Sequence, residues 1–182
     1  MSHFTVVVFS KDGTEADVER LLAPYDEQDE WGREGSYWDW WVIGGRWEGQ
    51  LTGRDPVTIE VPCNLCNGTG ARDWTGCDVT PEWIAECNGC NGCRGTGTRT
   101  EYPNQYNNDV FGNSCPPAAI RPDFVPYAFV TPDGEWIGNG EMGWWGIERE
   151  EGQDSEEQWR TKFAEAKGAF AGTTAVLVDC HV

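Results

Sequence analysis

Two pairs of cysteines are the residues of this 182-residue chain whose spacing predicts a definite chemistry. Cys63 and Cys66 form the first pair, Cys90 and Cys93 form the second, and each pair opens a C-x-x-C-x-G-x-G repeat. Two such pairs, about 24 residues apart, can supply four thiolates to one tetrahedral Zn²⁺. The glycines let the backbone turn sharply around the metal and point its N–H groups at the sulfur atoms. The pattern predicts one structural zinc ion.

The second pair has an ambiguous register. Cys87 lies three residues before Cys90, so C-x-x-C can also be read as Cys87 with Cys90. We prefer Cys90 with Cys93, because only this register places the G-x-G sequence as in the first repeat. The spacing leaves open whether Cys87 replaces one of the two. Cys77 and Cys87 are otherwise spare thiols.

A second candidate site lies in segments that are rich in tryptophan and glycine. Residues 37–47 place an aspartate and an arginine among five aromatic rings, and residues 140–146 place a carboxylate and two tryptophans among glycines. Strands dense in tryptophan usually belong to a core, but polar side chains among rings also suit the wall of a pocket. The candidate ligand or partner pocket consists of Asp39, Arg46, Trp47, Glu141 and Trp144, with His3.

The chain has two histidines, His3 and His181, near the ends of the first and last predicted strands. We expect them to lie far apart whether these strands pair in parallel or antiparallel, so a metal shared between them would need a special geometry. Cys180 and His181 point to opposite faces of one strand and so cannot act together as nucleophile and base. No G-x-S-x-G, H-E-x-x-H, Walker A or dinucleotide-binding fingerprint occurs. We predict no catalytic residues and favour a binding protein over an enzyme.

The charge balance restricts the partners. Thirteen Lys and Arg face 31 Asp and Glu, which gives a formal net charge of −18. Binding to a phosphate backbone is driven by exchange of cationic side chains for counterions, so this charge argues against a nucleic-acid partner and favours a basic protein. No apolar run approaches 18 residues and the N-terminal residues do not resemble a signal peptide, so we expect a cytoplasmic protein without a membrane span. In that compartment cysteines are better metal ligands than disulfide partners.

Hydrophobic periodicity predicts the regular elements that must position these residues. Ser155 with Gln158 predicts a capping box at the start of a helix, and Thr80 with Pro81 predicts the start of a short one. The first and last strands are the most apolar, so we expect them at the centre of a sheet. The predicted strands are 4–9, 38–43, 57–61, 127–131, 135–138 and 174–182, and the other predicted helix begins after Thr14 and is stopped by Pro24.

The predicted fold class is α+β, with a small, mostly antiparallel sheet, two flanking helices and an inserted zinc-knuckle lobe. Residues 1–62 and 122–182 are predicted to form one discontinuous domain. Residues 63–100 form the inserted zinc-binding lobe, and the Asn- and Pro-rich residues 101–121 form an irregular return arm.

Two resemblances add to this prediction. The C-x-x-C-x-G-x-G repeats resemble the cysteine-rich zinc domain of DnaJ-type co-chaperones, although that family carries four repeats and this chain has two and lacks a His-Pro-Asp motif. The chain as a whole is similar to a family of small proteins of tailed phages, notably of actinobacteria, which implies a phage origin and a host cytoplasm. The segments that carry the second resemblance are 1–6, Gly-Gly-Arg-Trp at 44–47, Thr-Pro-Asp-Gly-Glu-Trp at 131–136, Gly-Glu-Met-Gly-Trp at 140–144 and Val-Asp-Cys-His at 178–181.

The predicted function is that of an acidic, tryptophan-rich, zinc-binding phage accessory protein. We expect it to bind a host protein, either as a factor of host takeover or as an inhibitor of host defence. A structural protein of the virion is an alternative, and a small-ligand protein or enzyme that uses Asp39, Arg46 and Glu141 is another. The sequence leaves the identity of the partner and the oligomeric state open.

Overall fold

The computed structural model describes residues 3–27, 36–139, 141, 142, 148, 149 and 154–182, the side chains of 141, 142, 148 and 149 excepted. The chain divides into two compact units. Residues 1–56 and 104–182 form the larger unit, here called the body, and residues 57–103 form the smaller unit, here called the lobe. Each unit is described by itself.

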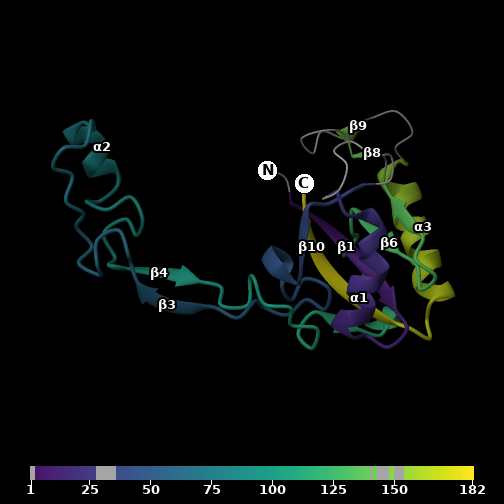
Figure 1. The fold of residues 1–182 in the computed structure, drawn as a ribbon. Helices are drawn as coiled ribbons and strands as arrows, with labels where there is room; N and C mark the ends of the chain where they lie inside the picture. Colours follow the sequence, from purple (N-terminus) through teal and green to yellow (C-terminus); the bar gives the residue numbers. More distant parts are fainter. Residues whose placement is uncertain (1–2, 28–35, 140, 143–147, 150–153) are drawn as a thin grey trace. The chain divides into compact units, whose positions relative to one another are not determined.

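The body is built on a mixed sheet whose two longest strands lie at its centre (Figure 1). β1 and β10 pair antiparallel over eight residues each, from His3 opposite His181 to Ser10 opposite Thr174. β6 joins β1 in parallel, and the remaining neighbours pair antiparallel in the order β2-β10-β1-β6-β7, with β5 also on β10. The predicted α+β fold with a mostly antiparallel sheet is confirmed. The strands are β1 (His3–Ser10), β2 (Trp40–Ile43), β5 (Ser114–Cys115), β6 (Ala128–Val130), β7 (Trp136–Gly138) and β10 (Thr174–His181), and a separate ribbon pairs β8 (Glu141–Met142) with β9 (Glu148–Arg149).

One helix covers each face of the central strands. Successive side chains of a strand point to opposite faces, so β1 and β10 place apolar side chains on both faces of the sheet. Helix α1 (Glu15–Leu22) packs its buried Val18, Leu21 and Leu22 against one face. Helix α3 (Glu156–Ala169) packs Trp159, Phe163 and Ala166 against the other face. The core therefore consists of two apolar clusters separated by the sheet, and the helices are the two flanking helices that the sequence predicts.

Side-chain caps fix where these helices begin. Thr14 accepts a hydrogen bond from the backbone N–H of Asp17 at 3.2 Å, which starts α1. Ser155 and Gln158 form the predicted capping box, in which each side chain accepts from the other residue's backbone N–H. These caps satisfy N–H groups that have no partner within the helix. Three short 3₁₀ turns complete the body, at η1 (Ala23–Tyr25), η2 (Gly45–Trp47) and η3 (Pro117–Ala119).

The lobe contains an antiparallel two-stranded ribbon, a short helix and two cysteine loops. The ribbon pairs β3 (Ile59–Pro62) with β4 (Thr98–Glu101). Helix α2 (Pro81–Glu86) begins after Thr80, whose side chain accepts from the backbone N–H of Trp83. Residues 57–62, predicted to belong to the larger domain, lie in the lobe, and residues 104–121, predicted to belong to the return arm, lie in the body.

In the part of the chain that the structure describes, no helix combines the length and the apolar content needed to cross a lipid bilayer.

Candidate metal centre and histidine cluster

Four buried thiols meet inside the lobe. The Sγ atoms of Cys63, Cys66, Cys90 and Cys93 all lie within 4.8 Å of one another. Cys63 and Cys90 are 3.8 Å apart, and Cys66 and Cys93 are 3.7 Å apart. Four sulfurs held tetrahedrally at about 2.3 Å from one ion stand about 3.8 Å apart, so the cluster has the size of a thiolate metal site. Disulfides, with sulfurs about 2.05 Å apart, do not fit these distances.

The two cysteine loops have the same backbone course. In each, a glycine N–H donates to the second sulfur at 3.3 Å, Gly70 to Cys66 and Gly97 to Cys93. Both glycines have a positive φ, 78° and 80°. A Cβ on Gly97 would stand 2.4 Å from the carbonyl oxygen of Gly68, so the two loops approach each other backbone to backbone. The repeated glycines are therefore required by the close approach of the loops as well as by the turns.

The cluster favours loss of a proton from one thiol. Burial raises the pKa of Cys90 to about 11. Burial acts in the same direction on Cys93, but the Gly97 N–H and the neighbouring thiols outweigh it and lower the pKa of Cys93 to about 6. A thiolate is the form that binds metals, and a dication would displace the remaining protons.

The spare cysteines lie outside the cluster. Among the described residues, these four cysteines are the only group of three or more His, Cys, Asp or Glu side chains that lie close enough to share a metal ion. Cys87 is half-buried and Cys77 is exposed. The geometry thus favours the register that pairs Cys90 with Cys93.

The two histidines of the body lie side by side, so the expectation that they are far apart is wrong. An antiparallel pair places the start of one strand beside the end of the other, and β1 and β10 put His3 directly opposite His181. Their rings meet edge to face with centroids 5.0 Å apart. Trp40, which is the neighbour of His181 on β2, stacks on the His181 ring with centroids 5.3 Å apart.

A carboxylate fixes each imidazole through its Nδ1 atom. His3 Nδ1 donates to Asp179 at 2.9 Å, and His181 Nδ1 donates to Asp39 at 2.6 Å. The environments differ, because the Asp179 side chain is 1% exposed and the Asp39 side chain is 45% exposed. The second oxygen of Asp179 accepts the backbone N–H of Arg46 at 2.9 Å, so Asp179 ties β1 to the turn η2. Gly45 permits this approach, since a Cβ there would stand 2.4 Å from Asp179 Oδ2.

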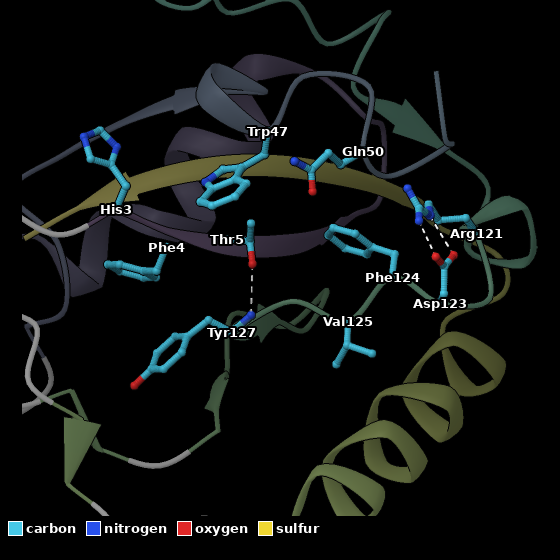
Figure 2. Close-up of a pocket in the computed structure, with 10 residues that line it drawn as sticks. All are labelled: His3, Phe4, Thr5, Trp47, Gln50, Arg121, Asp123, Phe124, Val125 and Tyr127. Atoms are coloured by element: carbon cyan, nitrogen blue, oxygen red, sulfur yellow. Dashed lines mark hydrogen bonds and ion pairs between the residues drawn. The ribbon is translucent and has the colours of Figure 1, made fainter. Parts of the chain in front are cut away.

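The structure brings together some residues of the predicted pocket. His3 and Trp47 line one hollow beside β1, shown in Figure 2. Asp39 lies in the histidine cluster through its bond to His181, and the Arg46 side chain is exposed. Trp144 lies outside the described residues, and so does the side chain of Glu141.

Sequence reasoning missed Asp179, the most buried carboxylate of the cluster. Its signal was its position in β10, two residues before His181 and therefore on the same face as His181 and His3. Between these two residues, Cys180 faces the other side and is fully buried, and burial raises its pKa well above the usual range for a thiol. Cys180 is therefore a core residue and not a nucleophile.

Comparisons of the chain with protein-family models, with curated proteins and with solved structures find no match.

Proposed function

We propose that the lobe holds one structural Zn²⁺ on Cys63, Cys66, Cys90 and Cys93. The S–S distances of 3.7 and 3.8 Å support zinc, because they match those of a tetrahedral tetrathiolate site. All four ligands come from the protein and are buried, which leaves no open position for a substrate. Such an ion organises the loops around it and contributes directly to folding.

The zinc assignment is tested on purified protein by elemental analysis. We expect one zinc per chain in the wild type and its loss in Cys63→Ser. Cys77→Ser is the matched control, since this thiol is exposed and outside the cluster, and it should retain the metal. Wild-type protein without zinc, or a Cys63→Ser variant that keeps it, would contradict the assignment.

We propose further that the protein binds a partner protein through its lobe. The observation that carries this proposal is the concentration of exposed apolar side chains in residues 57–103. Of the seven large hydrophobic side chains that are exposed in the described chain, five belong to this unit. They are Val57, Ile59, Leu65, Trp83 and Tyr102.

The ribbon supplies a continuous part of this surface. Ile59 and Val61 alternate in β3 and therefore share one face of the ribbon, with Val61 half-buried, and Val57 lies two residues before Ile59. These three residues are here called the apolar row. Val57 is 51% exposed and Ile59 is 45% exposed. Opposite them on β4 lie Glu101, beside Ile59, and Arg99, beside Val61. A two-stranded ribbon is marginally stable by itself, so an apolar row that stays exposed on it suits a surface that a partner covers.

The partner is inferred to be a basic protein of the host. A net charge of −18 attracts basic surfaces and repels phosphate backbones. The resemblance to phage proteins suggests that the partner is a host protein in the host cytoplasm. A structural role in the virion is the second candidate, and a stoichiometric amount of the protein in purified particles would support it.

The binding proposal is tested by affinity capture from host lysate with matched variants. We expect one stoichiometric partner for the wild type, and at least about tenfold less of it for the double variant Val57→Ser, Ile59→Ser, since each buried aliphatic side chain contributes about 1.5–3 kcal/mol. Phe111→Ser is the control, because Phe111 is 88% exposed but belongs to the body. A partner that the double variant retains, or the absence of any partner, would refute the proposal.

A further inference from the structure

Three of the four Asn-Gly sequences of the chain lie in the lobe, beside the cysteines of the metal site. They begin at Asn67, Asn88 and Asn91, and the fourth begins at Asn139 in the body. In this dipeptide the backbone nitrogen of the glycine can attack the Cγ atom of the asparagine, because glycine has no Cβ to obstruct the approach. Ammonia leaves as a cyclic succinimide forms, and water then opens the ring to aspartate or isoaspartate.

The folded lobe occupies the attacking nitrogen at all three places. The Gly68 N–H donates to the carbonyl oxygen of Cys63 at 3.0 Å, and the Gly89 N–H donates to that of Ile84 at 3.1 Å. The Gly92 N–H bonds to a sulfur of the metal site. The nitrogen must lose its proton and turn towards the side chain before it can attack, so each of these hydrogen bonds opposes the reaction.

The backbone at the first of these sequences does not itself require an asparagine. Asn67 and Arg94 occupy the same position in the two C-x-x-C-x-G-x-G repeats, and each has a φ of 50°. The second loop therefore shows that this turn accepts arginine. Asn67→Arg removes the reactive amide and keeps the backbone conformation that the loop needs.

The hydrogen bonds that protect these sites depend on the metal centre. Within residues 57–103, all of which the structure describes, the buried residues are the four cysteines and two glycines of the same loops. The cysteines form a cluster that contains no other side chain. The lobe thus has no apolar core beyond its metal ligands, and the ion supplies most of its folding free energy. Loss of the ion should open the loops and release the three glycine nitrogens.

We propose that Asn67, Asn88 and Asn91 are deamidation sites that make loss of the metal irreversible. This proposal rests on the structural ion proposed above, which holds the three glycine N–H groups in place while it is bound. Isoaspartate adds a carbon atom to the backbone. At residue 67 this atom enters the loop between Cys66 and Gly70, whose N–H donates to the Cys66 sulfur at 3.3 Å. The altered loop no longer presents its sulfurs at the spacing of the metal site, so the chain does not bind the ion again.

The test compares zinc-loaded full-length protein with the same protein kept in a chelator, both incubated at mildly alkaline pH. Mass spectrometry of tryptic peptides measures the conversion of each amide to an acid, and cleavage after Arg72 separates Asn67 from the other two sites. We expect deamidation at the three sites to be at least about tenfold faster in the metal-free protein. Asn139, in the body, is the matched control and should react at the same rate in both samples.

A second measurement links the modification to metal binding. After zinc is restored, the chains that bind it again should be depleted of isoaspartate at residue 67. Asn67→Arg should lose its capacity to bind zinc more slowly than the wild type during incubation without metal. Asn64→Gln is the control in the same loop, because Asn64 precedes Leu65 and not a glycine, and it should behave as the wild type.

Two results would overturn the proposal, namely equal deamidation rates in zinc-loaded and metal-free protein, and zinc binding by chains that carry isoaspartate at residue 67. The second result is read on wild-type protein, so it decides even if Asn67→Arg does not fold. Protein that holds no zinc at all would refute the metal assignment together with this proposal. The zinc content of the same samples distinguishes that outcome from equal rates in loaded protein.

Discussion

Replacing Asp179 by alanine should destabilise the body by about 3–5 kcal/mol. The carboxylate is 1% exposed and accepts two hydrogen bonds, from His3 Nδ1 and from the Arg46 backbone N–H, both at 2.9 Å. Hydrogen bonds to an ionised group contribute about 1.5–3 kcal/mol each, and the two donors left behind are partly buried. For a unit of this size the loss corresponds to a fall of roughly 10–20 °C in Tm.

Urea unfolding of zinc-loaded protein, followed by far-UV circular dichroism, measures this loss. Asp179→Asn should cost about half as much, since an amide oxygen still accepts one of the two bonds. Asp39→Ala provides a matched control inside the same cluster. Asp39 also holds a histidine, at 2.6 Å, but it is 45% exposed, so solvent screens the pair and we expect a loss of about 1 kcal/mol or less.

The reasoning fails if Asp179→Ala costs less than about 1 kcal/mol. It fails equally if Asp39→Ala is as damaging as Asp179→Ala. The first result would mean that the buried carboxylate is not the link between β1 and η2, and the second that burial does not set the strength of these pairs.

Three further predictions concern other parts of the chain. Gly97→Ala places a Cβ 2.4 Å from the Gly68 carbonyl oxygen, at a residue whose φ is 80°. We expect this variant to bind zinc at least about tenfold more weakly in a competition with a chelator, and we expect a smaller effect for the control Thr96→Ala. Phe163→Ala should lower the free energy of unfolding by about 3–5 kcal/mol in urea, because Phe163 is 1% exposed, and a loss near zero would contradict the packing of α3. Burial raises the pKa of Asp17, but the hydrogen bonds of its carboxylate to the Ser10 hydroxyl and to Arg20 outweigh this effect and hold the pKa below 3.8. The stability that the ionised carboxylate contributes is therefore complete above pH 3.8 and is lost as pH falls through the folded pKa. Asp17→Asn should therefore be less stable than the wild type at pH 6, and the difference should shrink as pH falls below 3.8; a difference that stays constant with pH would contradict this linkage.

Local patterns predicted the elements well because each depends on neighbouring residues. The caps at Thr14, Thr80 and Ser155 are formed as the sequence indicates. The apolar runs at both ends of the chain form the central strands, because strands buried on both faces need near-continuous hydrophobic sequences. The four cysteines also meet, because short glycine loops determine their geometry.

The histidine cluster and the hollow beside β1 could not be predicted in the same way. The position of His3 opposite His181 depends on the full register between two strands at opposite ends of the chain. Reasoning about strand ends should have allowed for it, since antiparallel pairing joins the first residue of one strand to the last residue of the other. The hollow beside Trp47 depends on how η2 and the segment before β6 pack against β1, and no local pattern encodes that contact.

The placement of β10 at the centre of the sheet sets an order of events during synthesis. β1 ends at Ser10 and β10 begins at Thr174, so a ribosome needs roughly 10–30 s to make the intervening chain. All four thiols are present about 80 residues before β10 begins, and their contacts are local, so the lobe can capture its metal while the body still lacks its central strand. During that interval β1 has no partner on one edge. The apolar strand β1 is therefore the segment that a chaperone would protect until β10 is synthesised.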